Sequence, residues 1–83
     1  MVKILTILVK DRIKEAGKTQ QLLTEFGNII RSRLGFHEVS EKICSRVGVI
    51  ILHLTGNPED WSVFESRLSE IGGIEYKSVV FDI

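Results

Sequence analysis

The sequence is poor in the features that mark secreted or membrane proteins. Its single cysteine cannot form a disulfide within the chain, which fits a reducing compartment. The longest uninterrupted apolar run is four residues, 49–52, whereas a membrane-spanning helix needs about 20. No apolar block follows Met1 ahead of a small-residue cleavage site, so we expect no export signal. These absences predict a cytoplasmic protein without a membrane partner.

The sequence also lacks an excess of charge of either sign. Eleven Lys and Arg residues balance eleven Asp and Glu residues, whereas a nucleic-acid module normally has a basic surplus to contact phosphates. Direct nucleic-acid binding is therefore not expected. The charge is nevertheless uneven: residues 31–46 have four basic and two acidic residues, and residues 57–75 have five acidic residues and one basic residue. Either both segments are solvated faces, or the basic segment receives an anion or an acidic partner.

The 83 residues contain the same strand–helix–strand pattern twice in succession. A strand pattern at residues 3–10 precedes a helical pattern from about residue 14, and a strand follows. A second strand pattern at 47–54 precedes a helical pattern at 57–71 and a last strand at 73–83. We therefore expect one domain, 1–83, of the α+β class. It would have a ferredoxin-like βαββαβ fold, with a four-stranded antiparallel sheet and two helices on one face.

The first and third predicted strands are apolar on both faces. In the first, Leu5, Ile7 and Val9 alternate with Ile4, Thr6 and Leu8, and residues 47–54 show the same pattern. A strand with one wet face should instead alternate apolar with polar residues. These two strands are therefore expected to form the central pair, with helices on one face. Another subunit is expected to cover the second face, which predicts a homodimer or a higher homo-oligomer.

The two predicted helices differ in how clearly they end. Apolar residues continue the first helical period as far as Phe26, where Gly27 offers a left-handed cap; a continuation to Gly35 is the alternative, and we favour Gly27. In the second helix, Asn57 is a predicted N-cap and Pro58 suits the first helical position. Its expected buried stripe is Trp61, Phe64, Leu68 and Ile71, and its acids, Glu59, Asp60 and Glu65, are expected to be solvated.

The residues most able to bind a metal or act as nucleophiles are His37, Cys44 and His53, and their spacing fits no zinc pattern. A hairpin turn near residues 43–44 would place Cys44 in the turn. It would also place His53 opposite residue 34, about 10 Å along the strand from His37. No glycine-rich loop precedes a helix, so no phosphate-binding cofactor is expected. The sequence therefore predicts no metal, no cofactor and no catalytic residues.

The segment after the first strand is the strongest candidate for a binding site. Residues 10–14 (KDRIK) follow the carboxyl end of a predicted central strand and precede a helix, whose first N–H groups are free. A small anion could bind there with help from Arg12 or Lys10. The alternative is a solvated connection in which Asp11 or a neighbour caps the helix.

Three segments carry a family resemblance: ILVKDR at 7–12, LLTEFGNIIRSRLGF at 22–36 and GGIEYKSVVF at 72–81. They resemble the small stand-alone ACT-like proteins labelled as regulators of the iron-only hydrogenase system, and the resemblance extends over roughly residues 3–82. It implies a ferredoxin-like fold, subunit pairing and a regulatory or ligand-sensing role.

Two departures limit what the resemblance implies. ACT domains that bind amino acids usually have Asp-Arg-Pro-Gly in the first loop; Asp11 and Arg12 match, but Ile13 and Lys14 replace Pro and Gly. The fold is also similar to the C-terminal domain of nickel-responsive repressors. This chain lacks their closely spaced histidines and their DNA-binding arm, so direct operator binding is not expected.

The sequence therefore predicts a homo-oligomeric sensing domain that is not an enzyme. The expected ligand is a small anion, and the candidate ligand-binding residues are Asp11 and Arg12, with Arg31 or Arg33 from the facing end of the hairpin. One alternative is a small enzyme of the dimeric α+β barrel type, with His53 or Tyr76 in a pocket between helices and sheet. A structural adaptor that recruits a larger protein through a sheet edge is another.

Overall fold

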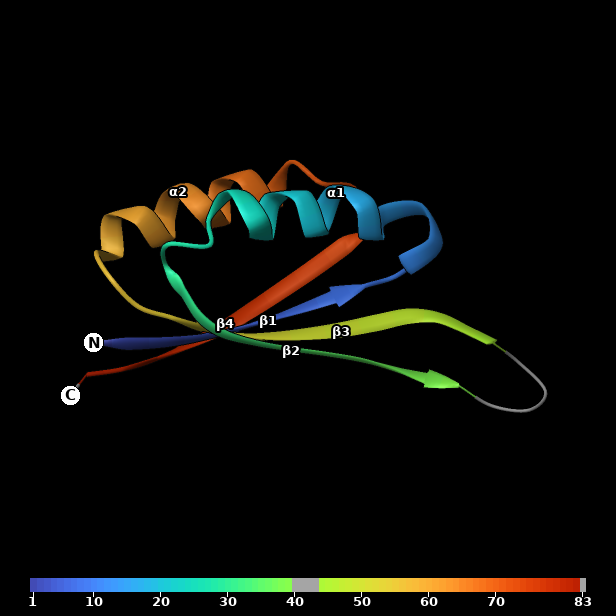
Figure 1. Ribbon diagram of the computed structural model, residues 1–83, viewed down its shortest axis with the longest axis horizontal. Helices are drawn as coiled ribbons and strands as arrows, with labels where there is room; N and C mark the ends of the chain where they lie inside the picture. Colours follow the sequence, from blue (N-terminus) through green and yellow to red (C-terminus); the bar gives the residue numbers. More distant parts are fainter. Residues whose placement is uncertain (40–43, 83) are drawn as a thin grey trace.

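A computed structural model describes residues 1–39 and 44–82 of the chain. The elements in chain order are β1 (Val2–Val9), α1 (Arg12–Glu25), β2 (Ile30–Val39), β3 (Cys44–Leu54), α2 (Pro58–Ser69) and β4 (Ile74–Phe81). The strands form one antiparallel sheet in the order β2-β3-β1-β4. Both helices lie on one face of it (Figure 1). The predicted ferredoxin-like fold and its central pair, β1 and β3, are confirmed.

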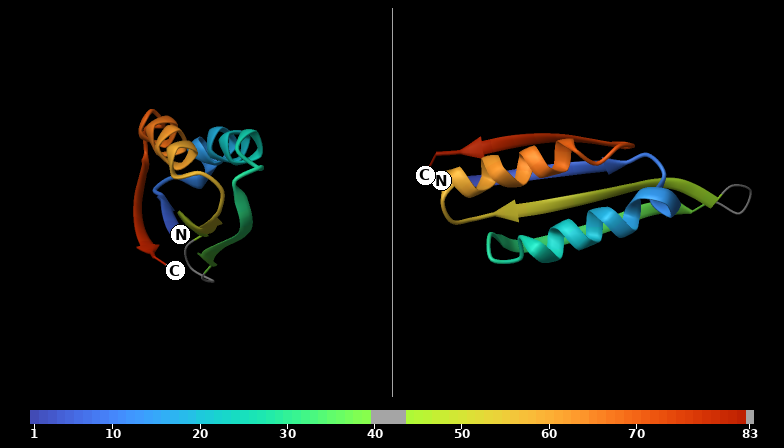
Figure 2. Two further views of the ribbon diagram at one scale, coloured as in Figure 1. Left: turned by 90° about the vertical axis from the view of Figure 1, so that its left-hand side faces the viewer. Right: turned by 90° about the horizontal axis from the view of Figure 1, so that it is seen from above.

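The helices form a single layer over the sheet, with α2 above the β4 side and α1 above the β2 side (Figure 2). We call the covered side of the sheet the inner face and the opposite side the open face. The helices have 14 and 12 residues, and within the described chain neither is long and apolar enough to cross a membrane.

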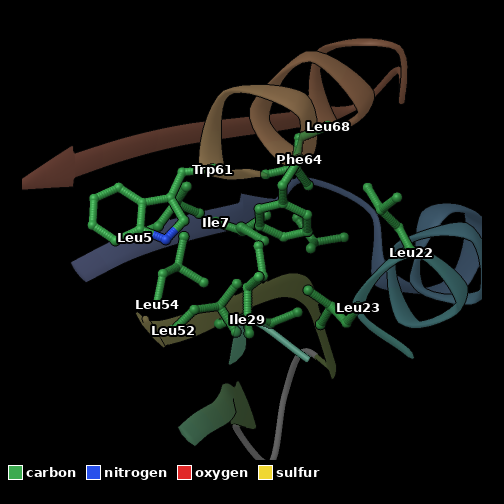
Figure 3. Packing of buried hydrophobic residues seen from close by; sticks show 12 residues of the cluster. Leu5, Ile7, Leu22, Leu23, Ile29, Leu52, Leu54, Trp61, Phe64 and Leu68 are labelled. Atoms are coloured by element: carbon green, nitrogen blue, oxygen red, sulfur yellow. The ribbon is translucent and has the colours of Figure 1, made fainter. Parts of the chain in front are cut away.

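The core fills the space between the helices and the inner face (Figure 3). Phe64 of α2 has no exposed surface and lies 5.2 Å, centroid to centroid, from the ring of Phe26. From the sheet, the strand residues predicted to share one face are buried here together. The buried hydrophobic residues are Leu5, Ile7, Val9, Leu22, Leu23, Ile29, Ile50, Leu52, Leu54, Trp61, Phe64 and Leu68.

The C-terminal end of α1 confirms the favoured stop near Gly27 and corrects the cap expected there. The helix ends at Glu25 and β2 begins at Ile30, so the extension to Gly35 is wrong. Gly27 is not among the glycines with positive φ, so the expected left-handed cap is wrong as well. Short turns end the helix instead, because the N–H of Gly27 donates to the Thr24 carbonyl at 3.2 Å and that of Ile29 to the Phe26 carbonyl at 3.1 Å.

The start of α2 confirms the sequence prediction. Asn57 has extended backbone angles and its Oδ1 accepts the N–H of Glu59 at 3.0 Å, with Pro58 as the first helical residue. Trp61, Phe64 and Leu68 are buried as expected. The acid Glu65 is not simply solvated, however. It accepts a hydrogen bond from the Lys3 ammonium at 2.8 Å, and the two side chains are only 19% and 12% exposed.

The β2–β3 hairpin is longer than predicted. The turn expected near residues 43–44 is corrected at Cys44, which is the first residue of β3, while residue 43 lies outside the described part. Because the strands pair further toward the turn, His53 lies opposite Ser32 and not residue 34. The pairing of β1 with β3 stops at Val9 and Gly48, so the hairpin continues beyond β1 as a two-stranded arm (Figure 1).

Candidate functional site

The first loop is held in place by its own backbone and by Asp11. The Asp11 carbonyl accepts the N–H groups of Lys14 and Glu15 at 3.1 and 2.9 Å, and its Oδ1 lies 3.4 Å from the nitrogen of Lys14. The N–H of Lys10 donates to the carbonyl of Gly73 at 2.9 Å, which ties this loop to the start of β4. Asp11 is therefore the N-cap of α1, which is the capping role that the sequence analysis gave as the alternative to ligand binding. Arg12 is the first helical residue.

Glu15, which the sequence analysis did not single out, is the most unusual residue near this loop. It is only 5% exposed, yet its carboxylate takes part in no hydrogen bond or ion pair of the described residues. It packs over Gly73: a Cβ at position 73 would lie 3.0 Å from its Cγ and 3.2 Å from its Oε1. Its carboxylate oxygens are not among the described polar atoms that are fully shielded without a partner, so the carboxylate remains accessible beside the loop and can accept a hydrogen bond from a positively charged group. The sequence gives only a weak signal for this contact, namely an acid in the first turn of a helix and a Gly-Gly pair far along the chain.

Gly73 supplies a test of this packing. Its φ of 77° is unfavourable for any residue with a Cβ, by about 1–2 kcal/mol, and Glu15 leaves no room for one. Gly73→Ala is therefore expected to lower the free energy of unfolding by about 2 kcal/mol, or roughly 8–16 °C in melting temperature by circular dichroism. Gly72→Ala is the matched control, because nothing lies within 4 Å of its added Cβ. Equal melting temperatures for the two variants would contradict the packing described here.

The predicted arginine partners lie at the other end of the sheet. Arg33 is paired with Leu52, four residues along the hairpin from the level of Val9, which is about 13 Å. Its guanidinium donates to the side-chain oxygen of Gln20 on α1. Arg31 is exposed and falls at a shift in the strand register. The structure therefore brings neither arginine to Asp11 and Arg12.

The residues considered for metal binding or catalysis are not gathered either. Among the described residues, no three His, Cys, Asp or Glu side chains are placed to hold a metal ion. His53 lies on the open face, opposite Ile4 and Ser32, while Tyr76 lies on the inner face, with its hydroxyl 3.4 Å from that of Ser69. The two candidates of the enzyme hypothesis are thus on opposite faces and cannot share one pocket.

A groove of about 470 Å³ separates the two helices on their solvent side. Charges of both signs line it, from Lys18 and Glu25 of α1 and Arg67 and Glu70 near the end of α2. Arg67 pairs across the groove with Glu25 at 2.7 Å, and both side chains are about half exposed. An exposed pair of this kind contributes little to stability. Of the predicted site residues whose side chains are described, Asp11, Arg31 and Arg33, none lines the groove.

The most extensive feature is the open face, which no helix of the described chain covers (Figure 1). Strand pairing places most of its side chains in register across the four strands. They are Val2, Ile4, Thr6 and Leu8 of β1, Ser32 and Leu34 of β2, Val47, Val49, Ile51 and His53 of β3, and Glu75, Lys77, Val79 and Phe81 of β4. Several of the apolar ones are strongly exposed, among them Leu34 at 62%, Val79 at 57% and Phe81 at 52%.

His53 adds a polar feature to this apolar surface. Its Nε2 is shielded from solvent and has no hydrogen-bond partner among the described residues. A ring nitrogen that is shielded from solvent and has no hydrogen-bond partner is uncommon in native protein structures. The open face therefore combines exposed apolar side chains with an unsatisfied polar atom.

Comparisons with known proteins place the chain in context. The model of the TM1266-like family, described as "Iron-only hydrogenase system regulator, putative", matches residues 1–78. The solved structure of uncharacterized protein TM1266 from Thermotoga maritima is similar with a TM-score of 0.83 and 28% sequence identity, over 98% of this chain and 96% of that one. No curated protein matches.

Proposed function

The chain belongs to the TM1266-like family, and we propose that it is a regulatory domain of an iron-only hydrogenase system that acts as a homo-oligomer and senses a ligand. The family description supplies the regulated system, as a regulator of iron-only hydrogenase. The open face is the observation that supports the homo-oligomer. The first loop supports the sensing role.

The exposed surface is larger than a self-sufficient domain of this size would have. The accessible surface is 5600 Å², whereas a compact monomer of 9.4 kDa exposes about 5,000 Å². The radius of gyration is 13.2 Å, against about 12 Å for a compact chain of this length. The uncovered, apolar sheet face and the projecting β2–β3 arm both contribute to this excess (Figure 1). A partner surface would bury it and could supply the hydrogen bond that His53 lacks.

The sensing part of the proposal concerns the first loop. Asp11, Arg12 and Glu15 lie at the carboxyl end of a central strand, where α1 begins. Two carboxylates already stand at this helix end, so an anion alone, the ligand expected from the sequence, is poorly matched here. A ligand with an ammonium group is the better match, because the Glu15 carboxylate can accept a hydrogen bond from it. The side chain of Arg12, the other residue predicted here, lies outside the described part of the chain.

Deleting the gene from a host that carries an iron-only hydrogenase tests this function. We expect hydrogenase activity in cell extracts to change and the wild-type gene to restore it. The Glu15→Gln variant, which keeps the shape of the side chain, is expected to fold but to restore regulation poorly. Unchanged hydrogenase activity after deletion would contradict the regulatory role, and full complementation by Glu15→Gln would contradict the proposed sensing site.

A further inference from the structure

Among the open-face positions that the strand pairing assigns, the formal charges are confined to one edge of the sheet. Glu75 and Lys77 of β4 lie opposite Leu8 and Thr6 of β1, which places both charged residues on the open face. Both are exposed, and neither takes part in an ion pair of the described residues. Tyr76, between them, lies opposite the buried Ile7 and so on the inner face. The edge therefore presents an acid and a base, two residues apart, beside an apolar surface.

The spacing of these two charges has a consequence for a symmetric pair of subunits. If a two-fold axis crosses the strands at the level of Tyr76, position 76 + n of one copy faces position 76 − n of the other. Glu75 then faces Lys77 of the partner subunit, and Lys77 faces Glu75 of the partner subunit. On β3 the same axis sets Ile51 against Val49 of the partner subunit, because Ile50 is at the level of Ile7. Charges meet opposite charges and apolar side chains meet apolar ones.

The other symmetric way to stack two open faces does not give this match. An axis parallel to the strands would place β4 of one copy over β2 of the other, since these are the two edges of the sheet. By the strand register, Glu75 would then lie over position 36 and Lys77 over Leu34, and neither position supplies a countercharge. Covering a charge that has no partner costs several kcal/mol, whereas a pair at the rim is neutral to slightly favourable. The pairing of these charges therefore favours the axis that crosses the strands.

The dimensions of the molecule fit this arrangement. The molecule measures 44 Å along its longest and 17 Å along its shortest dimension, and the sheet lies parallel to both (Figure 1). The open face is therefore at most about 750 Å², near the roughly 800 Å² that each partner buries in a standard interface. The level of Tyr76 lies near the middle of this length when the hairpin arm is included. The arm has only its own two strands, which are marginal in water, and this axis lays it over the partner's sheet.

We propose that two copies pack open face to open face about a two-fold axis that crosses the strands at the level of Tyr76 and Ile7, with reciprocal Glu75–Lys77 pairs between the subunits. This arrangement rests on the proposed homo-oligomer and specifies its partner surface. It also makes the edge strand β4 the part of the interface that sets alignment, because an axis at Glu75 or Lys77 brings like charges together and other registers leave both charges without a countercharge.

Charge reversal measured by sedimentation at low ionic strength tests the arrangement. Lys77→Glu and Glu75→Lys are each expected to raise the dimer dissociation constant roughly 10- to 30-fold, since two attractive pairs become repulsive. The double variant Glu75→Lys/Lys77→Glu is expected to return it to within about threefold of wild type, because it restores both pairs. Lys18→Glu, an exposed reversal on α1, is the control and should leave association unchanged.

The outcomes separate this inference from the proposed function. A wild-type chain that stays monomeric at high micromolar concentration overturns the homo-oligomer itself. An oligomer whose single reversals have no effect, or whose double variant fails to recover, overturns only the arrangement. Association that follows the charges but survives Ile51→Glu indicates edge-to-edge pairing through β4, and that result also overturns the face-to-face packing.

Discussion

Replacing Ile51 by glutamate is expected to yield a folded monomer, whereas the same replacement at its neighbour Leu52 is expected to unfold the chain. The two residues are consecutive in β3 but point to opposite faces: Leu52 has no exposed surface in the core, and Ile51 is half-buried on the open face. A charge at Leu52 has no partner under the helices and costs several kcal/mol, comparable with the whole stability of about 4–12 kcal/mol for 83 residues.

At Ile51 the cost depends on whether a second subunit covers the face. In a monomer the new carboxylate reaches water, so the free energy of unfolding should change by about 1 kcal/mol or less. In the proposed dimer each copy would bury it against apolar side chains, and the dissociation constant should rise roughly a thousandfold. Light scattering after size-exclusion chromatography measures the mass, and circular dichroism checks the fold. If the Ile51→Glu protein keeps the oligomeric mass of the wild type, the open face takes no part in the interface and the proposed packing is wrong.

The adjacent pair also shows which part of the fold the sequence can predict. Strands β1 and β3 are apolar on both faces, and that pattern alone places them at the centre of the sheet, as the structure confirms. The start of α2 is equally readable, because Asn57 and Pro58 act locally on the residues that follow them. Features that depend on neighbours in the chain are recovered well.

Features that depend on contacts between distant parts of the chain are not recovered from the sequence. Glu65 looked solvated because nothing near it in the sequence reveals Lys3, its partner 62 positions away. The hairpin register was misjudged because the polar residues around the turn do not say where β3 begins, and this moved His53 from residue 34 to Ser32.

The candidate site illustrates the same limit. The sequence predicts a site at Asp11 and Arg12 in the first loop, but their expected partners Arg31 and Arg33 lie away from it, in the first part of β2. Glu15 escaped notice because its significance comes from burial beside Gly73, which β4 brings to it. By contrast, the alternation of Glu75 and Lys77 with Tyr76 was visible in the sequence and gained meaning once β4 was known to be an edge strand.

Phe64→Ala is expected to remove most of the stability of the isolated subunit. The ring has no exposed surface, lies against the ring of Phe26, which follows α1, and fills the space between both helices and the sheet (Figure 3). Truncating a buried phenylalanine costs about 3–5 kcal/mol, since the transfer free energy is lost and a cavity remains. Val63→Ala is the matched control on the same helix, because Val63 is 52% exposed and should change stability by less than about 0.5 kcal/mol.

The dependence of this loss on protein concentration links the core to the open face. If folding and association are coupled, each tenfold rise in concentration stabilises the native dimer by about 1.4 kcal/mol per mole of dimer. The urea midpoint of Phe64→Ala should therefore rise with protein concentration, and a variant that is unfolded when dilute should regain helical circular dichroism when concentrated. The Phe64→Ala/Ile51→Glu double variant should lose that dependence, because it can no longer bury the face. A midpoint for Phe64→Ala that ignores concentration would show that the subunit folds without its partner, and the excess exposed surface would then need another explanation.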